Sequence, residues 1–236
     1  CRCHAYCIEP WRPPHEYPSR TRELVRPVLK HSYTLVAPFY DAFLSAATRG
    51  ARKRSLAALD AGPPRDVLLL GVGTGLDLPH LPVRHRYVGL DLTAAMLRRA
   101  RPRAVGLRFT PLRGDVQRLP FRDASFDVAV LHLILAVVPS PTFCLAEAVR
   151  VLKPGGTLLV FDKFLRRGET GWKRILNPLT RHVATRLDVV FEDVLEAVGG
   201  LDVSANEAAL ASGWFRLIRL EKPKPAGTGD ERAPAA

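Results

Sequence analysis

Three glycines and one aspartate have the residue types and the spacing of a nucleoside-binding site. The apolar run Val67–Leu70 leads into Gly71, Gly73 and Gly75, and Asp91 ends a second apolar run twenty residues after Gly71. Glycine has no Cβ, so its backbone can turn sharply and approach a ligand closely. An aspartate at the tip of the next strand can accept hydrogen bonds from both hydroxyls of a ribose. The pattern therefore predicts a nucleoside-binding unit.

The glycine spacing narrows the class of ligand. The turn has the form G-x-G-x-G, with Leu76 and Leu78 in place of the further small residue that a dinucleotide-binding turn requires. No G-K-S/T sequence follows, which excludes a triphosphate loop. The turn suits a nucleoside without phosphates, whose charge is carried by an amino-acid end and a sulfonium.

The segments that must position this turn alternate between strand and helix. The predicted strands are Val67–Leu70, Arg86–Leu90, Leu107–Leu112, Phe126–Leu131 and Thr157–Phe161. The predicted helices are Ala94–Arg101, Pro141–Leu152 and Phe191–Val198, with Ser140 as a cap and Lys153–Gly156 as a stop. Leu201–Ala208 and Trp214–Leu220 are expected to pair as an antiparallel edge.

Apolar strands separated by helices indicate a parallel sheet that is covered on both faces. We predict an α/β fold with a Rossmann-like seven-stranded sheet, mostly parallel with an antiparallel last strand. Helices cover both of its faces, and a helical extension precedes it, because apolar residues recur at three-to-four spacing from Thr21 to Leu59.

Five segments fall in the order of a known family. They are Val67–Gly75, Gly89–Leu97, Arg113–Phe121, the stretch from Ser125-Phe-Asp-Val128 onward, and Arg150–Gly156. With these motifs the sequence resembles the class I S-adenosylmethionine-dependent methyltransferases, in the type 11 group that includes the quinone-ring C-methyltransferases. The likeness extends from about Leu35 to Lys222.

The resemblance implies a role for each matched position of the cofactor site. The turn Gly71–Gly75, with Val72 and Thr74, gives the methionine end of S-adenosylmethionine room beside the backbone. Asp91 holds the ribose hydroxyls, while Leu92 and Met96 pack near the adenine and ribose. A helix cap is the alternative role for Asp91, and a plain core position is the alternative for Met96.

The resemblance also implies which residues contact the adenine and which lie near the reacting end of the cofactor. Asp115 accepts from the adenine amino group, and the Val116 N–H donates to a ring nitrogen. His132 lines the cofactor mouth, or is a core histidine. His132 and Tyr40 are the candidate catalytic residues, and no metal is called for, because the methyl group is already activated by the sulfonium.

One position departs from the family pattern. Leu69 stands two residues before the first glycine, where the family usually has an acid that anchors the amino end of the cofactor. Loss of one charge-assisted hydrogen bond of about 1.5–3 kcal/mol would weaken binding ~10- to 100-fold. Asp77, just past the turn, is the candidate replacement.

The charge of the chain points to a polyanionic partner or to composition bias. Its 236 residues carry a net charge of +12, and 47% of them are hydrophobic. Such a chain is drawn to anionic membranes or nucleic acid. Candidate membrane contacts are Arg20, Arg22, Arg26, Lys30 and the run Arg52–Arg54, with a solvated basic face as the alternative.

A closer resemblance within the family predicts the substrate. Ser32–Asp41, Pro79–Pro82 and His132–Pro139 look like segments of bacterial phosphatidylethanolamine N-methyltransferases. This implies methyl transfer to a lipid amine. The alternatives are C- or O-methylation of a quinone, aromatic or polyketide, and a non-catalytic cofactor-binding protein. Nucleic-acid binding ranks last, because no basic-aromatic stripe or known module is present.

The chain is expected to divide into four parts. Residues 1–20 form a disordered extension, 21–60 an N-terminal helical lid, 61–222 the methyltransferase domain and 223–236 a disordered tail. The longest apolar stretch, Val128–Val138, is interrupted by His132 and is too short to span a bilayer. We expect a cytoplasmic protein that is peripheral on the inner face of the membrane.

Overall fold

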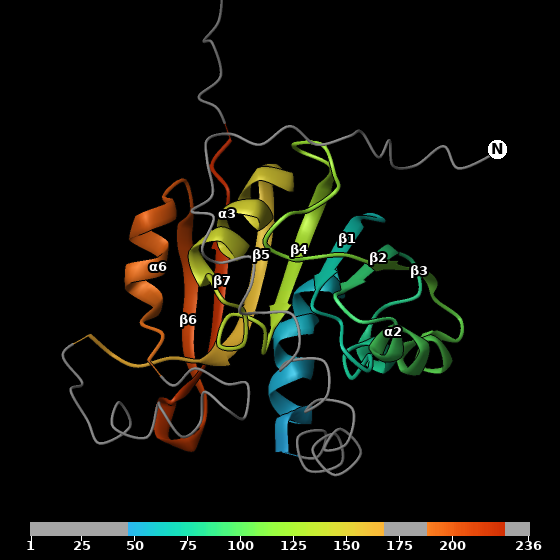
Figure 1. Cartoon of the computed structure of the whole chain (residues 1–236), viewed down its shortest axis with the longest axis horizontal. Coiled ribbons are helices and arrows are strands. Elements are labelled where there is room, and N and C mark those ends of the chain that lie inside the picture. Colours follow the sequence, from blue (N-terminus) through green and yellow to red (C-terminus); the bar gives the residue numbers. More distant parts are fainter. Residues whose placement is uncertain (1–46, 168–187, 225–236) are drawn as a thin grey trace, which may run out of the picture.

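The computed structural model describes residues 47–167 and 188–224, which build a seven-stranded sheet in the order β3-β2-β1-β4-β5-β7-β6 (Figure 1). Neighbours among β1 to β5 pair in parallel, and β7 runs antiparallel to both β5 and β6. This confirms the predicted sheet. The strands are β1 Asp66–Leu70, β2 Arg86–Asp91, β3 Arg108–Arg113, β4 Phe126–His132, β5 Leu152–Lys163, β6 Asp202–Leu210 and β7 Phe215–Glu221.

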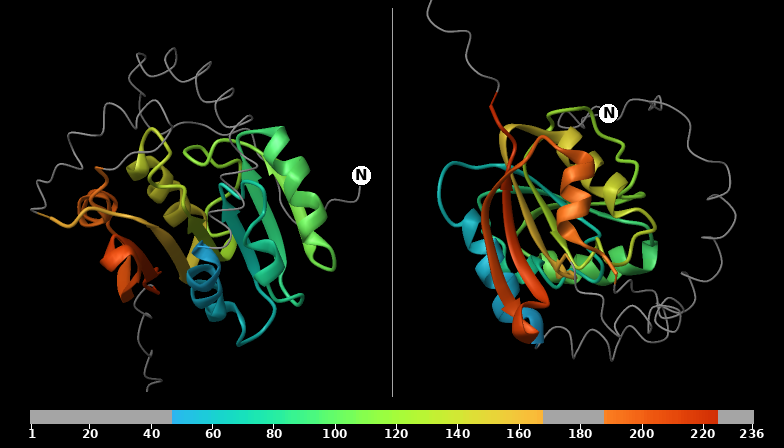
Figure 2. Two further views of the ribbon diagram at one scale, coloured as in Figure 1. Left: turned by 90° about the horizontal axis from the view of Figure 1, so that it is seen from below. Right: turned by 90° about the vertical axis from the view of Figure 1, so that its left-hand side faces the viewer.

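Helices cover both faces of the sheet. They are a helix over residues 47–56, η2 Ala57–Leu59, η3 Leu78–His80, α2 Ala94–Ala100, η4 Arg101–Ala104, α3 Pro141–Val151, α6 Phe191–Val198 and η6 Ala211–Gly213. The helix over residues 47–56 lies on the opposite side of the sheet from α3 and α6 (Figure 2). The described part of the predicted lid therefore packs on the sheet.

The alternation of side chains along β1 separates two apolar cores. Leu68 and Leu70 pack in the core that includes α3 and α6. Val67 and Leu69 pack on the other face, in the core that includes Leu56. Leu56 belongs to the helix over residues 47–56, which we call the N-terminal helix. Successive side chains of a strand point to opposite faces, so a buried strand contributes to both layers. β1 is thus fixed from both sides, and so is the turn that follows it.

Local signals set the helix ends close to the predicted residues. The side chain of Ser140 accepts a hydrogen bond from the Phe143 N–H at 3.3 Å, which starts α3. Thr93 caps α2 in the same way. Gly199 closes α6 with a φ of 66°, a left-handed conformation that glycine adopts without strain.

The start of β5 corrects one prediction. The sequence predicts a stop at Lys153–Gly156 before a strand that begins at Thr157, but β5 begins at Leu152. Leu152 pairs with Phe126 and Thr157 pairs with Val128, so the intervening residues of β5 form an irregularity in the β4–β5 register. The Gly155 N–H also donates to the Lys222 carbonyl at 2.8 Å. Pairing on both sides therefore extends the strand through the glycines.

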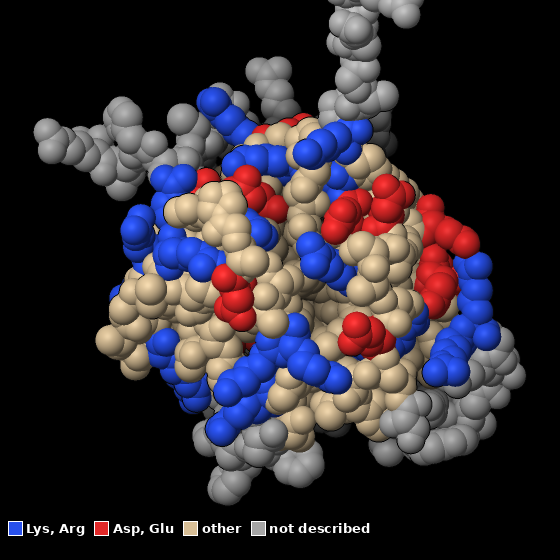
Figure 3. Space-filling model, turned by 180° about the vertical axis from the view of Figure 1, so that it is seen from behind, with Lys and Arg blue, Asp and Glu red and all other residues tan. Residues whose placement is uncertain are grey.

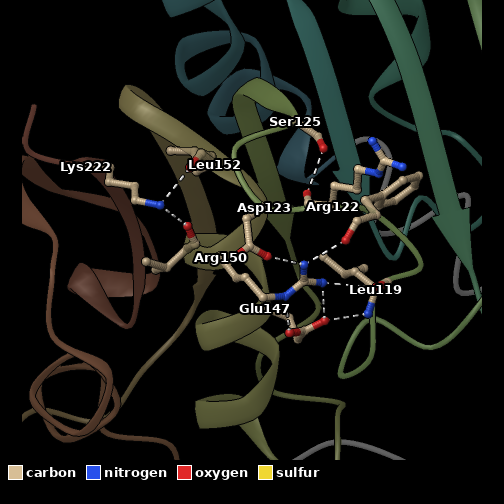
Figure 4. Close-up of polar contacts among 10 residues, drawn as sticks. Leu119, Arg122, Asp123, Ser125, Glu147, Arg150, Leu152 and Lys222 are labelled. Carbon is tan, nitrogen blue, oxygen red and sulfur yellow. Dashed lines mark hydrogen bonds and ion pairs between the residues drawn. The ribbon is translucent and has the colours of Figure 1, made fainter. Parts of the chain in front are cut away.

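An arginine holds the segment between β3 and β4 against α3 (Figure 4). The Arg150 guanidinium donates to both carboxylate oxygens of Glu147, to Asp123, and to the carbonyls of Leu119 and Phe121. Glu147 in turn accepts from the Leu119 N–H at 2.7 Å. A guanidinium has five N–H donors, and all five are used here. We call this the Arg150 cluster.

The two edges of the sheet are irregular. β6 has register shifts between Val203 and Ala205 and between Ala208 and Leu210. β3, at the other edge, contains Pro111. Proline has no N–H to donate to a ladder, and bulges interrupt one.

Candidate active site

The glycine turn and Asp91 meet at the carboxyl edge of the sheet, as the sequence predicts. The turn follows β1, and Asp91 is the last residue of β2. The Gly73 N–H donates to Asp91 Oδ2 at 3.0 Å. Strand order reverses at β1, which has β2 on one side and β4 on the other. Ligands of open α/β sheets bind at such a switch point.

The glycines of the turn serve different purposes. A Cβ on Gly73 would meet only the Gly71 carbonyl, at 3.8 Å, so the space beside Gly73 is open. A Cβ on Gly71 would lie 2.5 Å from Ile134, and one on Gly75 would lie 3.0 Å from Ala100. Gly71 and Gly75 therefore allow close packing inside the protein, and the room for a ligand lies at Gly73.

Asp91 retains acceptor capacity for a ligand. Its Oδ1 accepts from the N–H and the hydroxyl of Thr93, at 2.9 and 3.1 Å. With the bond from Gly73, three of about four acceptor positions of the carboxylate are used in the described contacts. Burial raises the pKa of Asp91, and these three donors oppose that rise. The half-buried Asp91 fits the ribose of a nucleoside, and the open space beside Gly73 fits the amino-acid end of the same ligand.

The predicted adenine residues follow β2 and β3, which are neighbours in the sheet. Leu92 is 46% exposed, and Met96, four residues later in α2, is half-buried. Asp115 is exposed, and its Oδ1 accepts from the Gln117 N–H at 2.9 Å. Val116 is 6% exposed. The Gly114 N–H donates to the Asp91 carbonyl at 3.0 Å, which joins the two segments.

His132 ends β4 and belongs to a buried hydrogen-bonded chain. Its Nδ1 lies 2.9 Å from Asp77 Oδ1, and its Nε2 lies 2.9 Å from the Ser55 hydroxyl. Arg52 Nη1 donates to the same Asp77 oxygen at 2.8 Å, and its Nε donates to Thr48 at 3.0 Å. We call this the His132 chain. It joins the N-terminal helix, the segment just past the glycine turn and β4.

The charges of this chain are balanced inside the protein. Burial alone would raise the pKa of Asp77, but the neighbouring His132 and Arg52 hold it well below its usual range. Asp77 is 7% exposed and Arg52 is 5% exposed. The carboxylate proposed to replace the missing acid at Leu69 is therefore neutralised by an arginine. Leu69 itself is 2% exposed and packs with apolar residues.

The burial of Arg52 corrects a prediction. The basic run Arg52–Arg54 predicts a membrane contact for all three residues, whereas only Lys53 and Arg54 are exposed. The helical period contains the signal that was missed. Thr48, Arg52 and Ser55 recur at i, i+4 and i+7, on the same face as buried Leu56. A polar stripe on a buried face indicates an internal network.

A second buried acid lies at the same edge of the sheet, and the motifs gave no sign of it. Asp162, near the end of β5, is 1% exposed. Its oxygens accept from backbone N–H groups, including those of Ala136 at 3.1 Å and Lys163 at 2.8 Å. Burial raises its pKa to about 6.

Several predicted residues lie outside the described ranges. They are Tyr40, the basic residues Arg20, Arg22, Arg26 and Lys30, and most of the predicted lid. Among residues 47–167 and 188–224, no helix is long and apolar enough to cross a membrane.

Comparison with known proteins identifies the family. Residues 68–160 match the family described as "Methyltransferase domain". The chain is 34% identical over 193 residues to the phosphatidylethanolamine N-methyltransferase of Cereibacter sphaeroides, covering 78% of this chain and 92% of that protein. It is 36% identical over 132 residues to the demethylmenaquinone methyltransferase of Renibacterium salmoninarum, covering 54% of this chain and 55% of that protein.

A solved structure shows the same fold. A S-adenosylmethionine-dependent methyltransferase of Thermotoga maritima superposes with a TM-score of 0.62 at 21% identity, over 81% of this chain and 99% of that chain. The chain belongs to the S-adenosylmethionine-dependent methyltransferases. It is an enzyme whose cofactor is S-adenosylmethionine, which supplies a methyl group activated by the positive sulfur.

Proposed function

We propose that the methyl acceptor is the primary amine of phosphatidylethanolamine. The observation that carries this is the extent of the likeness to the Cereibacter enzyme, which includes 92% of that protein's length. A likeness confined to the cofactor-binding half would say nothing of the acceptor. Here it extends well beyond residues 68–160, the part that matches the general family.

The residues of the glycine turn and Asp91 suit a direct displacement. Asp91 anchors the sugar of the cofactor, and the open backbone at Gly73 admits its amino-acid end. The protein then has to hold the acceptor in line and exclude water, and such positioning can supply ~7–11 kcal/mol. His132 ends the neighbouring strand β4 beside the glycine turn, and we assign it to the acceptor side of the cofactor.

The same proposal includes contact with an anionic membrane from the cytoplasmic side. Basic side chains gather in several groups on the face seen in Figure 3, with acidic ones between them. On the N-terminal helix Arg49, Lys53 and Arg54 are exposed. Each basic residue near an anionic surface contributes about 1 kcal/mol. This would hold the protein as a peripheral one on the inner face of the membrane.

A second candidate is methylation of a quinone ring. The likeness to the demethylmenaquinone methyltransferase favours it, although the match covers just over half of either chain. Both acceptors are membrane lipids, so basic surface residues would serve either. The two readings differ in the acceptor atom, which is nitrogen in one and carbon in the other.

Labelled methyl transfer tests the proposal. Purified protein is incubated with methyl-labelled S-adenosylmethionine and vesicles that contain phosphatidylethanolamine, a demethylated quinone, or neither. We expect label in the mono- and dimethylated phospholipid. Label in the quinone alone would establish the second candidate and overturn the first.

The cofactor site is tested apart from the acceptor. Asp91→Ala should weaken S-adenosylhomocysteine binding ~10- to 100-fold by calorimetry, because charge-assisted bonds to the ribose are lost. Asp202→Ala removes the same charge from an exposed position of β6 and is the matched control. Equal affinities of the two variants would contradict the placement of the sugar.

Sedimentation with vesicles tests the membrane contact. Replacing Arg49, Lys53 and Arg54 together by Gln should reduce binding to anionic vesicles and leave calorimetric cofactor binding unchanged. Replacing exposed Arg98, Arg99 and Arg101 on the α2–η4 segment is the matched control. An equal loss in the two triple variants would assign the effect to net charge alone.

A further inference from the structure

The protons of the His132 chain have a defined direction. Asp77 is ionised, because its pKa is held low, so it can only accept. In the neutral imidazole the proton is therefore on Nδ1, which donates to Asp77 at 2.9 Å. Nε2 is then the acceptor, and the Ser55 hydroxyl donates to it at 2.9 Å. The chain is arranged to pass a proton from Ser55 toward His132.

The hydrogen-bonded His132 chain is accessible to solvent at one end. Asp77 and His132 are 7% and 6% exposed, whereas Ser55 is only half-buried. Leu131 pairs with Leu70, so His132 lies beside the residue that begins the glycine turn. Ser55 is thus the most accessible member of the His132 chain, and it contacts His132 beside the glycine turn.

An amine acceptor needs a group that removes its proton. A primary ammonium has no lone pair and cannot attack until it loses a proton. For an amine with the pKa of lysine, about 10.4, on the order of one molecule in 10³–10⁴ is free at pH 7. General base catalysis of such a step contributes about 10²–10⁴-fold.

We propose that Ser55, His132 and Asp77 form a relay that removes a proton from the acceptor amine; this rests on the proposed N-methylation. The ammonium gives a proton to Ser55 Oγ while the Ser55 proton moves to His132 Nε2. The freed lone pair forms the new N–C bond as the C–S bond of the methyl donor breaks, and that electron pair stays with sulfur. His132 later releases its proton to water.

Arg52 and Thr48 position the relay. Arg52 binds the same Asp77 oxygen as His132 does, and its Nε is fixed by Thr48, so the carboxylate is held from two elements. The same residue types activate a serine nucleophile in hydrolases. Here Ser55 lies inside a helix, whose N–H groups bond within the helix and cannot bind an oxyanion. Proton transfer is the chemistry that remains.

The test is the pH dependence of methyl transfer to phosphatidylethanolamine vesicles. The charged groups that face His132 are Asp77, just past the glycine turn, and Arg52 of the N-terminal helix. Phe161 of β5 packs edge-on against the His132 ring. Ser55→Ala should lower kcat about 10²-fold or more at pH 7. Its rate should then rise about tenfold per pH unit and approach the wild type near pH 9, because only free amine reacts.

Several variants separate the relay from structural effects. His132→Gln should show the same steep profile as Ser55→Ala, and Ser55→Thr should restore the wild-type profile because it keeps the hydroxyl. Ser204→Ala, at an exposed position of β6, is the matched control and should match the wild type throughout. S-adenosylhomocysteine affinity of Ser55→Ala should stay within about twofold of the wild type.

Two outcomes overturn the relay. An unchanged rate in Ser55→Ala would do so, and so would a loss by the same factor at every pH, since a structural defect does not follow the ionisation of the amine. A wild-type protein that binds S-adenosylhomocysteine but puts no label into phosphatidylethanolamine would overturn the proposed function, and the relay with it.

Discussion

The molecule contains two arginine-centred networks that differ in how they end. In the Arg150 cluster all five guanidinium donors meet carboxylates or carbonyls within one loop and one helix. In the His132 chain, Arg52 meets Asp77, and the bonds continue through His132 to half-buried Ser55. The side chain of Arg150 is 24% exposed and that of Arg52 is 7% exposed.

This difference matches the chemical role that we propose for the His132 chain and the structural role of the Arg150 cluster. The Arg150 cluster is closed, because all five guanidinium donors have partners within it. It holds the loop between β3 and β4 against α3. A buried ion pair such as Arg52–Asp77 adds little to stability relative to apolar residues. Perturbed buried groups gather at functional sites. The His132 chain has an accessible end at half-buried Ser55, which the closed cluster does not have.

The largest effect is expected from breaking the buried pair. Arg52→Met leaves the Asp77 carboxylate buried without its arginine, which should lower the free energy of unfolding by about 3–5 kcal/mol in urea denaturation. Arg54→Met, two residues on and exposed, is the control and should stay within about 0.5 kcal/mol of wild type. Equal losses would show that Arg52 is not a buried partner in solution.

The next effect concerns an acid held by backbone N–H groups. Asp162 has a folded pKa of about 6 against 3.8, so it stabilises the fold at low pH, and that contribution is lost as pH rises from about 4 through 6. The loss amounts to about 3 kcal/mol. Asp162→Asn cannot titrate, so the fall in unfolding free energy between pH 4 and pH 8 should shrink by this amount. Identical falls would contradict the burial of this carboxyl.

A smaller effect is expected at the closed cluster. Arg150→Met removes five hydrogen bonds from a partly exposed site and should lower the free energy of unfolding by about 1–3 kcal/mol. Arg98→Met on α2 is the exposed control. Because the cluster lies outside the relay, the pH profile of methyl transfer should keep its shape. A steepened profile in Arg150→Met would break the distinction between the two networks.

The smallest effect is expected at an exposed pair. Lys153 Nζ lies 2.8 Å from Asp127, with side chains 38% and 33% exposed. Lys153→Met should lower the unfolding free energy by about 0.2–1 kcal/mol, and the difference should diminish in high salt. A loss of unfolding free energy as large as that of Arg150→Met would mean that the number of hydrogen bonds removed does not determine the size of the loss.

The fold was predictable because its signals are local. Apolar strand segments, the Ser140 cap and Gly199 each act within a few residues, so most element ends fell within one or two residues of the prediction. The start of β5 did not, because pairing of Leu152 with Phe126 depends on a strand far away in the sequence.

The site was predictable only in part, for the same reason. The glycine turn and Asp91 form one motif, and the structure brings them to 3.0 Å. The His132 chain joins Arg52, Asp77 and His132, which no motif links. Arg52 was assigned to the surface because it stands in a basic run, although its helical face is buried.

The irregular edges of the sheet affect the tendency of the protein to aggregate at high local concentration. Unpaired edge strands can recruit further strands and start aggregation. β3 presents Pro111 between arginines, and the register of β6 breaks twice. Copies concentrated on one vesicle would thus meet without matching ladders, so crowding at a lipid surface should leave them separate molecules.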